Sequence, residues 1–147
     1  MSPTGSKWRL DRPAEGFDAD PDLAPAAPAP MCRTFLPDNY EPRYPYPLLV
    51  VFHPHGGNEQ QVLDLVPQFS RRNFVAVGIR GPQLLGVRED GRLACGWGHD
   101  DAHTELVNEY VLRAVEGVRR TCHVHTERVF LVGVCEGAQA AYRAAFA

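Results

Sequence analysis

Three short apolar runs, each followed by a segment with helical periodicity, constrain the fold of this chain more than any other feature. The runs cover residues 48–52, 74–79 and 129–132 and are rich in β-branched and aromatic side chains. Continuous apolar runs of this length are typical of strands that are buried on both faces of a parallel sheet. Because helices separate these strands, the pattern predicts an α/β fold with a doubly wound, mostly parallel sheet and crossover helices.

Two of the three predicted helices begin at polar residues that suit helix N-termini. One begins at Asn58, with Gln61 three positions later as a capping partner. A second begins at Asp100 or Asp101, and a third covers residues 138–147. The spacing of apolar residues after the first two starts matches one face of an amphipathic helix.

Two further segments have weaker patterns. Residues 32–36 predict a short additional strand. Residues 80–98 predict a long loop, because they contain the turn pairs Gly81-Pro82 and Asp90-Gly91.

Residues 1–30 are rich in Pro, Ala and Asp, which predicts a flexible N-terminal tail. Residues 31–147 have the length of one domain. The last predicted strand has no further strand to cover its apolar edge, and no Gly, Lys or Arg ends the last helix before Ala147. We therefore expect residues 31–147 to be a partial domain, truncated after the helix that follows the third apolar run.

Charge and composition exclude several functional classes. The chain has 15 basic and 18 acidic residues and a net charge of −3, the wrong sign for a dedicated nucleic-acid-binding protein. It contains neither an apolar run of about 18 residues, as a membrane span requires, nor an apolar N-terminal leader. We expect a cytoplasmic protein without membrane or nucleic-acid partners, and the sequence leaves its oligomeric state open. In that compartment its four cysteines are reduced thiols: Cys32, Cys95, Cys122 and Cys135.

The most specific motif is the segment Gly133–Gly137, which reads G-V-C-E-G. It lies between a predicted buried strand and an Ala-rich helix, the context of a nucleophile elbow. Glycines on both sides permit a tight turn that lifts Cys135 to the end of the sheet. The helix N-terminus favours an anion there, so the motif predicts a nucleophilic thiolate. The alternative is an ordinary strand-to-helix turn, with Cys135 as a small core residue.

A second motif, His55-Gly56-Gly57, directly follows an earlier buried strand. Acyl transfer needs hydrogen-bond donors for the oxygen that becomes negatively charged in the tetrahedral intermediate. In the elbow architecture one donor is the backbone N–H after the nucleophile, here Glu136, and the other comes from this kind of loop. Gly57 is the predicted second donor, and Asn58 is the alternative. The motif is also compatible with a plain turn before a capped helix.

Together, residues 48–58 and 129–141 resemble the α/β-hydrolase superfamily, and the resemblance covers residues 32–147. The most similar groups are the carboxylesterase/phospholipase, polyhydroxyalkanoate-depolymerase-like and dienelactone-hydrolase-like groups. The resemblance implies hydrolysis of an ester or similar acyl bond of a small molecule, without a cofactor. It implies Cys135 as the nucleophile, Gly57 and Glu136 as oxyanion donors, and His55 as support for the oxyanion loop.

The chain departs from the superfamily pattern in three ways. Most esterases have Ser at the elbow, whereas dienelactone hydrolases resemble this chain in having Cys. The segment His53-Pro54-His55 stands where dienelactone hydrolases carry a Glu. The superfamily's acid and His follow the nucleophile along the chain, so they are expected after Ala147, and little turnover is expected of the present chain. The alternative general bases are His53 and His55.

Two other functional interpretations remain open at the sequence level. The first is a non-catalytic fragment or relic of an α/β-hydrolase. The second is a metal-dependent hydrolase, because His53-x-His55 and His99-x-x-x-His103 have spacings compatible with metal ligands. Trp97, in a loop at the predicted pocket end of the sheet, is either part of the substrate wall or an aromatic anchor for that loop.

Overall fold

The computed structural model describes residues 31–147, and in it four strands form one mixed sheet in the order β1-β3-β2-β6. Strand β2 runs parallel to β3 and to β6, whereas the edge strand β1 runs antiparallel to β3. The α/β class and a mostly parallel sheet are therefore confirmed. The predicted tail, residues 1–30, lies outside the described residues. The strands of the sheet are β1 (Cys32–Phe35), β2 (Tyr46–Phe52), β3 (Val75–Ile79) and β6 (Val124–Gly133).

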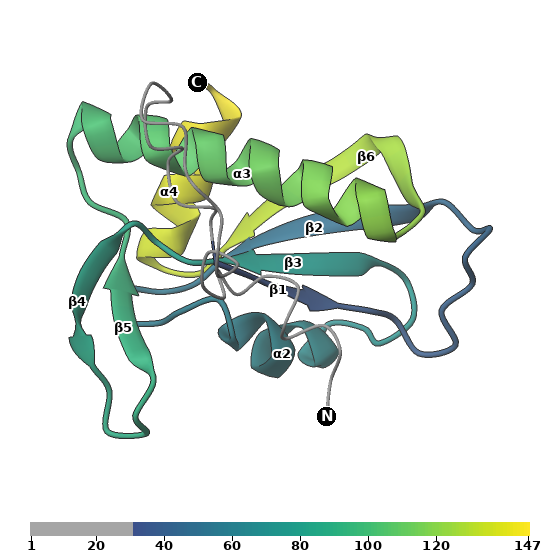
Figure 1. Cartoon of the computed structure of the whole chain (residues 1–147), viewed down its shortest axis with the longest axis horizontal. Coiled ribbons are helices and arrows are strands. Elements are labelled where there is room, and N and C mark those ends of the chain that lie inside the picture. Colours follow the sequence, from purple (N-terminus) through teal and green to yellow (C-terminus); the bar gives the residue numbers. More distant parts are fainter. Residues whose placement is uncertain (1–30) are drawn as a thin grey trace, which may run out of the picture.

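Helices cover both faces of this sheet, as Figure 1 shows. Helix α2 (Gln61–Leu65) and the short 3₁₀ helix η1 (Val66–Gln68) lie on one face. Helices α3 (Asp101–Thr121) and α4 (Glu136–Ala145) lie on the other. Among residues 31–147, no helix combines the length and the apolar character that a bilayer crossing demands.

The alternation of side chains along β2 explains the two layers. Leu48, Val50 and Phe52 are fully buried and pack in the cluster that includes the inner faces of α3 and α4. Val51 points to the opposite side and packs against α2. Burial of such side chains contributes about 1.5–3 kcal/mol each. Because both faces of β2 are covered, its sequence is continuously apolar rather than alternating.

The largest difference from the sequence-based prediction lies in residues 80–98, which form a hairpin rather than a long loop. Strands β4 (Gln83–Val87) and β5 (Leu93–Gly96) pair antiparallel, and the hairpin projects away from the main sheet (Figure 1). The predicted turn at Asp90-Gly91 does join the two strands. The strands were missed because they are short and because Gly86 interrupts β4.

Several element boundaries also differ from the prediction. The first helix contains only one α-helical turn before η1, which has Pro67 near its start, and Asn58 caps no helix. Its side-chain oxygen instead accepts the Gln60 N–H at 2.9 Å. Strand β6 begins at Val124, before the apolar run 129–132 that predicted it. By contrast, Asp100 caps α3 as predicted.

The topology places the ends of β2 and β6 at a switch point. From β2 the chain moves through α2 to β3 on one side, whereas β6 pairs with β2 on the other. The helices that follow β2 and β6, α2 and α4, therefore lie on opposite faces. In open α/β sheets, a ligand crevice forms at the carboxyl ends of the strands where connections diverge in this way. Both predicted motifs, at residues 55–57 and 133–137, lie at this position.

Candidate active site

Cys135 forms the tight turn between β6 and α4. Its backbone angles are φ 54° and ψ −120°, and its side chain is exposed. Among the described residues, only Asn39 is another non-glycine residue with positive φ. Asn tolerates positive φ, but for Cys a sparsely populated conformation costs about 1–3 kcal/mol. The strained residue is thus the one that the elbow motif assigns to the nucleophile.

The flanking glycines explain how the turn is held. A Cβ atom at Gly133 would overlap the backbone of Gly137, in the first turn of α4. A Cβ atom at Gly137 would overlap the carbonyl oxygens of Phe52 and His53 at the end of β2. Neither position has room for a side chain, so these two glycines allow α4 to pack directly against the end of the sheet.

The loop after β2 lies beside the elbow, and the two predicted oxyanion donors of these segments differ in their hydrogen bonds. The Gly57 N–H, a predicted oxyanion donor, donates to the carbonyl of Pro54 at 2.9 Å and closes a turn. The Glu136 N–H, the other predicted donor, has no hydrogen-bond partner within residues 31–147. Of the two predicted donors, only Glu136 is therefore unengaged in this structure. Asn58, the alternative to Gly57, is buried, and its side-chain amide donates to the carbonyl of Leu93 at 2.9 Å.

One polar contact joins the two motifs. The Nδ1 atom of His55 lies 2.9 Å from a carboxylate oxygen of Glu136, and both side chains are about half exposed. Glu136 immediately follows Cys135, so this pair connects the loop after β2 to the elbow. The structure therefore brings His55 and Glu136 together.

His53, by contrast, is a buried structural residue. Its Nδ1 lies 2.7 Å from the carbonyl of Pro54, and its Nε2 accepts the Gly81 N–H at 2.9 Å. This pairing fixes a neutral tautomer in which Nδ1 carries the proton. Burial lowers the pKa of the imidazole, in agreement with the neutral form. Because both ring nitrogens are engaged, His53 is not available as a general base or as a metal ligand.

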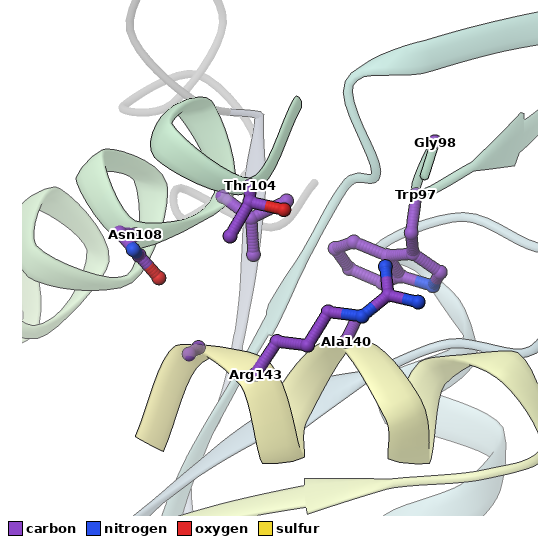
Figure 2. A pocket seen from close by; sticks show the side chains of 8 residues that line it. Trp97, Gly98, Thr104, Asn108, Ala140 and Arg143 are labelled. Carbon is purple, nitrogen blue, oxygen red and sulfur yellow. The ribbon is translucent and has the colours of Figure 1, made fainter. Parts of the chain in front are cut away.

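Trp97 is buried and anchors its loop to the core. The indole N–H donates to the carbonyl of His53 at 2.8 Å, and the ring stacks on the His53 imidazole with centroids 4.5 Å apart. These contacts match the anchoring interpretation. Trp97 also borders a small cavity of about 10 Å³ between α3 and α4, which Figure 2 shows together with Thr104, Asn108 and Arg143. This volume corresponds to about one water molecule.

A buried ion pair that the sequence did not predict lies behind the loop. Glu59 is 5% exposed, and the Nε atom of Arg80 donates to its carboxylate at 2.8 Å. A second nitrogen of the same guanidinium group donates to the other carboxylate oxygen. These hydrogen bonds raise the pKa of Arg80. The sequence signal that could have revealed this pair is position, because Glu59 and Arg80 follow the carboxyl ends of the adjacent parallel strands β2 and β3.

The other cysteines differ from Cys135. Cys32 and Cys95 are buried, and burial raises the pKa of each thiol, that of Cys32 to about 12. The negative charge of Glu59 adds to the increase at Cys32. Neither thiol is therefore suited to reaction as a thiolate. Cys122 is partly exposed and follows α3 at the opposite end of the sheet.

In the second pair of histidines considered as metal ligands, His99 and His103, it is His103 that contacts the residue capping α3. The backbone N–H and the ring of His103 both contact the Asp100 carboxylate, at 2.8 Å and 2.6 Å. These contacts hold the pKa of Asp100 below its usual range. Within residues 31–147, no three His, Cys, Asp or Glu side chains are arranged to hold a metal ion.

Comparisons with known proteins show a similarity of fold to solved structures. No family model matches the chain, and no curated protein matches its sequence. Nine chains among the solved structures match, including one described as "The complex of pOPH_S172C with DMSO". That match has a TM-score of 0.56 and 13% sequence identity, and it covers 78% of this chain and 41% of pOPH. The present chain thus spans less than half the length of pOPH, and at this identity the similarity concerns the fold alone.

Proposed function

We propose that this chain carries the nucleophile of a hydrolase of the α/β-hydrolase type that cleaves an ester or similar acyl bond of a small molecule. The observation that carries the proposal is the backbone of Cys135, with φ 54° and ψ −120° at the switch point of the sheet. Strained non-glycine residues are concentrated at functional sites. The close packing at Gly133 and Gly137 and the exposure of the thiol support the same interpretation.

In the proposed reaction, the Cys135 thiolate attacks the carbonyl carbon of the substrate. The N-terminus of α4 favours the negative charge on sulfur. The carbonyl oxygen becomes an oxyanion and accepts the Glu136 N–H. We propose Gly57 as the second donor, with its N–H shared in a bifurcated hydrogen bond between the carbonyl of Pro54 and the oxyanion. The C–O bond of the ester then breaks, the alcohol leaves, and water hydrolyses the resulting thioester.

A base must accept the thiol proton and return it to the leaving alcohol. Among the described residues, His55 is the imidazole that is bonded to the elbow, through Glu136. The carboxylate orients the ring through Nδ1 and leaves Nε2 as the proton acceptor. The resemblance to α/β-hydrolases implies a different His, later along a longer chain. In either case, His53 has a structural role only.

Limiting iodoacetamide followed by peptide mapping tests whether Cys135 is activated. Exposure alone favours labelling of Cys135. Its labelling rate is therefore compared with the rate for glutathione and with the rate for Cys135 in the urea-unfolded chain. A helix N-terminus stabilises an anion by up to about 1 kcal/mol, which corresponds to labelling about fivefold faster than in the unfolded chain. Equal rates, or faster labelling of Cys122, would contradict activation and favour a non-catalytic protein.

A further inference from the structure

The β4–β5 hairpin is fastened to the loop that follows β2. The Gly56 N–H donates to the carbonyl of Cys95 at 2.9 Å, and the Cys95 N–H donates to the carbonyl of Gly57 at 2.8 Å. The buried Asn58 amide donates to the carbonyl of Leu93, also in β5. These backbone and side-chain hydrogen bonds place the hairpin at a fixed position beside the proposed oxyanion loop.

A β-bulge in this hairpin inserts one extra residue, Leu85. Leu84 pairs with Cys95 and Gly86 pairs with Ala94, so two steps along β4 match one step along β5. Bulges are over-represented beside active sites, where they change the direction of a side chain. Leu85 is 42% exposed, and its neighbour Leu84 is 67% exposed. An exposed leucine is ordinary by itself, so the position of Leu85 is the informative property.

Leu85 lies next to the polar pair that reaches the elbow. A Cβ atom at Gly96 would lie 3.3 Å from the terminal carbon of Leu85 and 3.3 Å from Nδ1 of His55. The same Nδ1 atom lies 2.9 Å from Glu136, the residue after Cys135. Since Gly96 has no side chain, the space beside it is open and is bordered by the apolar end of Leu85, by the imidazole of His55 and by the side-chain oxygen of Gln83. Leu85 thus borders the same space as His55, which contacts the elbow through Glu136.

We propose that Leu85 is a specificity-determining residue that contacts the acyl chain of the substrate and makes the site selective for acyl groups with an extended apolar chain. This inference rests on the proposed function, because it assumes acylation at Cys135. The acyl carbonyl lies at the elbow, and the chain extends past His55 and Gly96 to the hairpin. Each methylene group that leaves water on contact with Leu85 increases the acylation rate if the contact is retained in the transition state.

The test compares acylation by p-nitrophenyl acetate and p-nitrophenyl octanoate, followed by nitrophenolate release and by the mass of the Cys135 peptide. Each rate is divided by the rate at which glutathione reacts with the same ester. The octanoate is used below the concentration at which it aggregates. The chain-length ratio is expected to be about tenfold in the wild type, which corresponds to partial burial of two or three methylene groups. It should fall to about twofold in Leu85→Ser, because the apolar contact is lost.

Two variants control for other effects of the substitution. Leu84→Ser, which changes a more exposed leucine of the same hairpin, should retain the wild-type ratio, and so should Leu85→Met, which preserves apolar contact. A wild-type ratio near one, or an equal loss in Leu84→Ser, would overturn the proposed role of Leu85. Failure of acetate to acylate Cys135 in the wild type would instead contradict the proposed function, so the two failures are distinguishable.

Discussion

The two loops at the carboxyl end of the sheet are adjacent but are stabilised in opposite ways. The loop after β2 is held by buried polar contacts, in which His53, Asn58 and Glu59 are each at most 5% exposed and hydrogen bonded to distant segments. The elbow after β6 is held by backbone packing at its glycines and by the Val134 N–H, which donates to the carbonyl of Phe52 at 3.3 Å. Its side-chain link, from Glu136 to His55, is about half exposed. The loop after β2 is thus a support held by buried polar contacts, whereas the elbow is a turn with an exposed thiol and an unengaged Glu136 N–H.

The first prediction concerns the buried ion pair of the support. In Arg80→Met the Glu59 carboxylate remains buried without its partner, and we expect a loss of about 4 kcal/mol in the free energy of unfolding. Urea unfolding measures this loss. Arg71→Met is the matched control, because its ion pair with Asp38 is exposed and should contribute less than about 1 kcal/mol. Similar losses in both variants would contradict the distinction between the support and the surface.

The second prediction concerns the packing that holds the elbow. Gly137→Ala forces a methyl group against the Phe52 and His53 carbonyls, so we expect destabilisation of about 3 kcal/mol. Gly56→Ala provides a comparison, since its Cβ would meet open space and only its positive φ is unfavourable, at about 1–2 kcal/mol. An equal or smaller effect at Gly137, measured by the same unfolding assay, would show that the elbow does not depend on this close approach.

These glycines also illustrate how much the sequence predicted. The spacing of Gly133, Cys135 and Gly137 after an apolar run located the turn correctly, because short-range sterics determine such a turn. The apolar runs likewise predicted the strands of the sheet. The ion pair of Glu59 with Arg80 and the hydrogen bond of Gly57 to Pro54 were not predicted. They depend on the register between strands and on the exact loop conformation, which local sequence patterns do not specify.

The third prediction concerns the pH dependence of the support. The pKa of His53 is lowered in the folded chain, so the unfolded chain binds the proton more tightly. The contribution of His53 to the free energy of unfolding is therefore fully present above a pH of about 6.5. It decreases as the pH falls below that value, by up to about 1.4 kcal/mol per pH unit. His53→Gln retains an acceptor for the Gly81 N–H but does not titrate, so this decrease should be reduced. His103→Gln should retain it, and equal pH profiles in all three proteins would contradict the assignment.

The fourth prediction concerns the exposed link between the loops. His55→Gln should change the free energy of unfolding by less than about 1 kcal/mol, because the pair with Glu136 is half exposed. It should nevertheless slow iodoacetamide labelling of Cys135, since the proton acceptor is lost and an unpaired carboxylate remains beside the thiolate. His103→Gln, which removes a similar pair with Asp100, should leave that rate unchanged. A large stability loss without a change in labelling would assign His55 to the support instead.

The most direct test of the central claim, that Cys135 is an acyl-accepting nucleophile, is the mass of the folded chain after brief reaction with p-nitrophenyl acetate. We predict one acetyl group per chain, located on the peptide that contains Cys135 and released by hydroxylamine as expected for a thioester. Cys135→Ala should remain unmodified, whereas Cys135→Ser should be acetylated more slowly because its hydroxyl needs stronger activation. Acetylation at Cys122, or equal modification of the wild type and Cys135→Ala, would contradict the account.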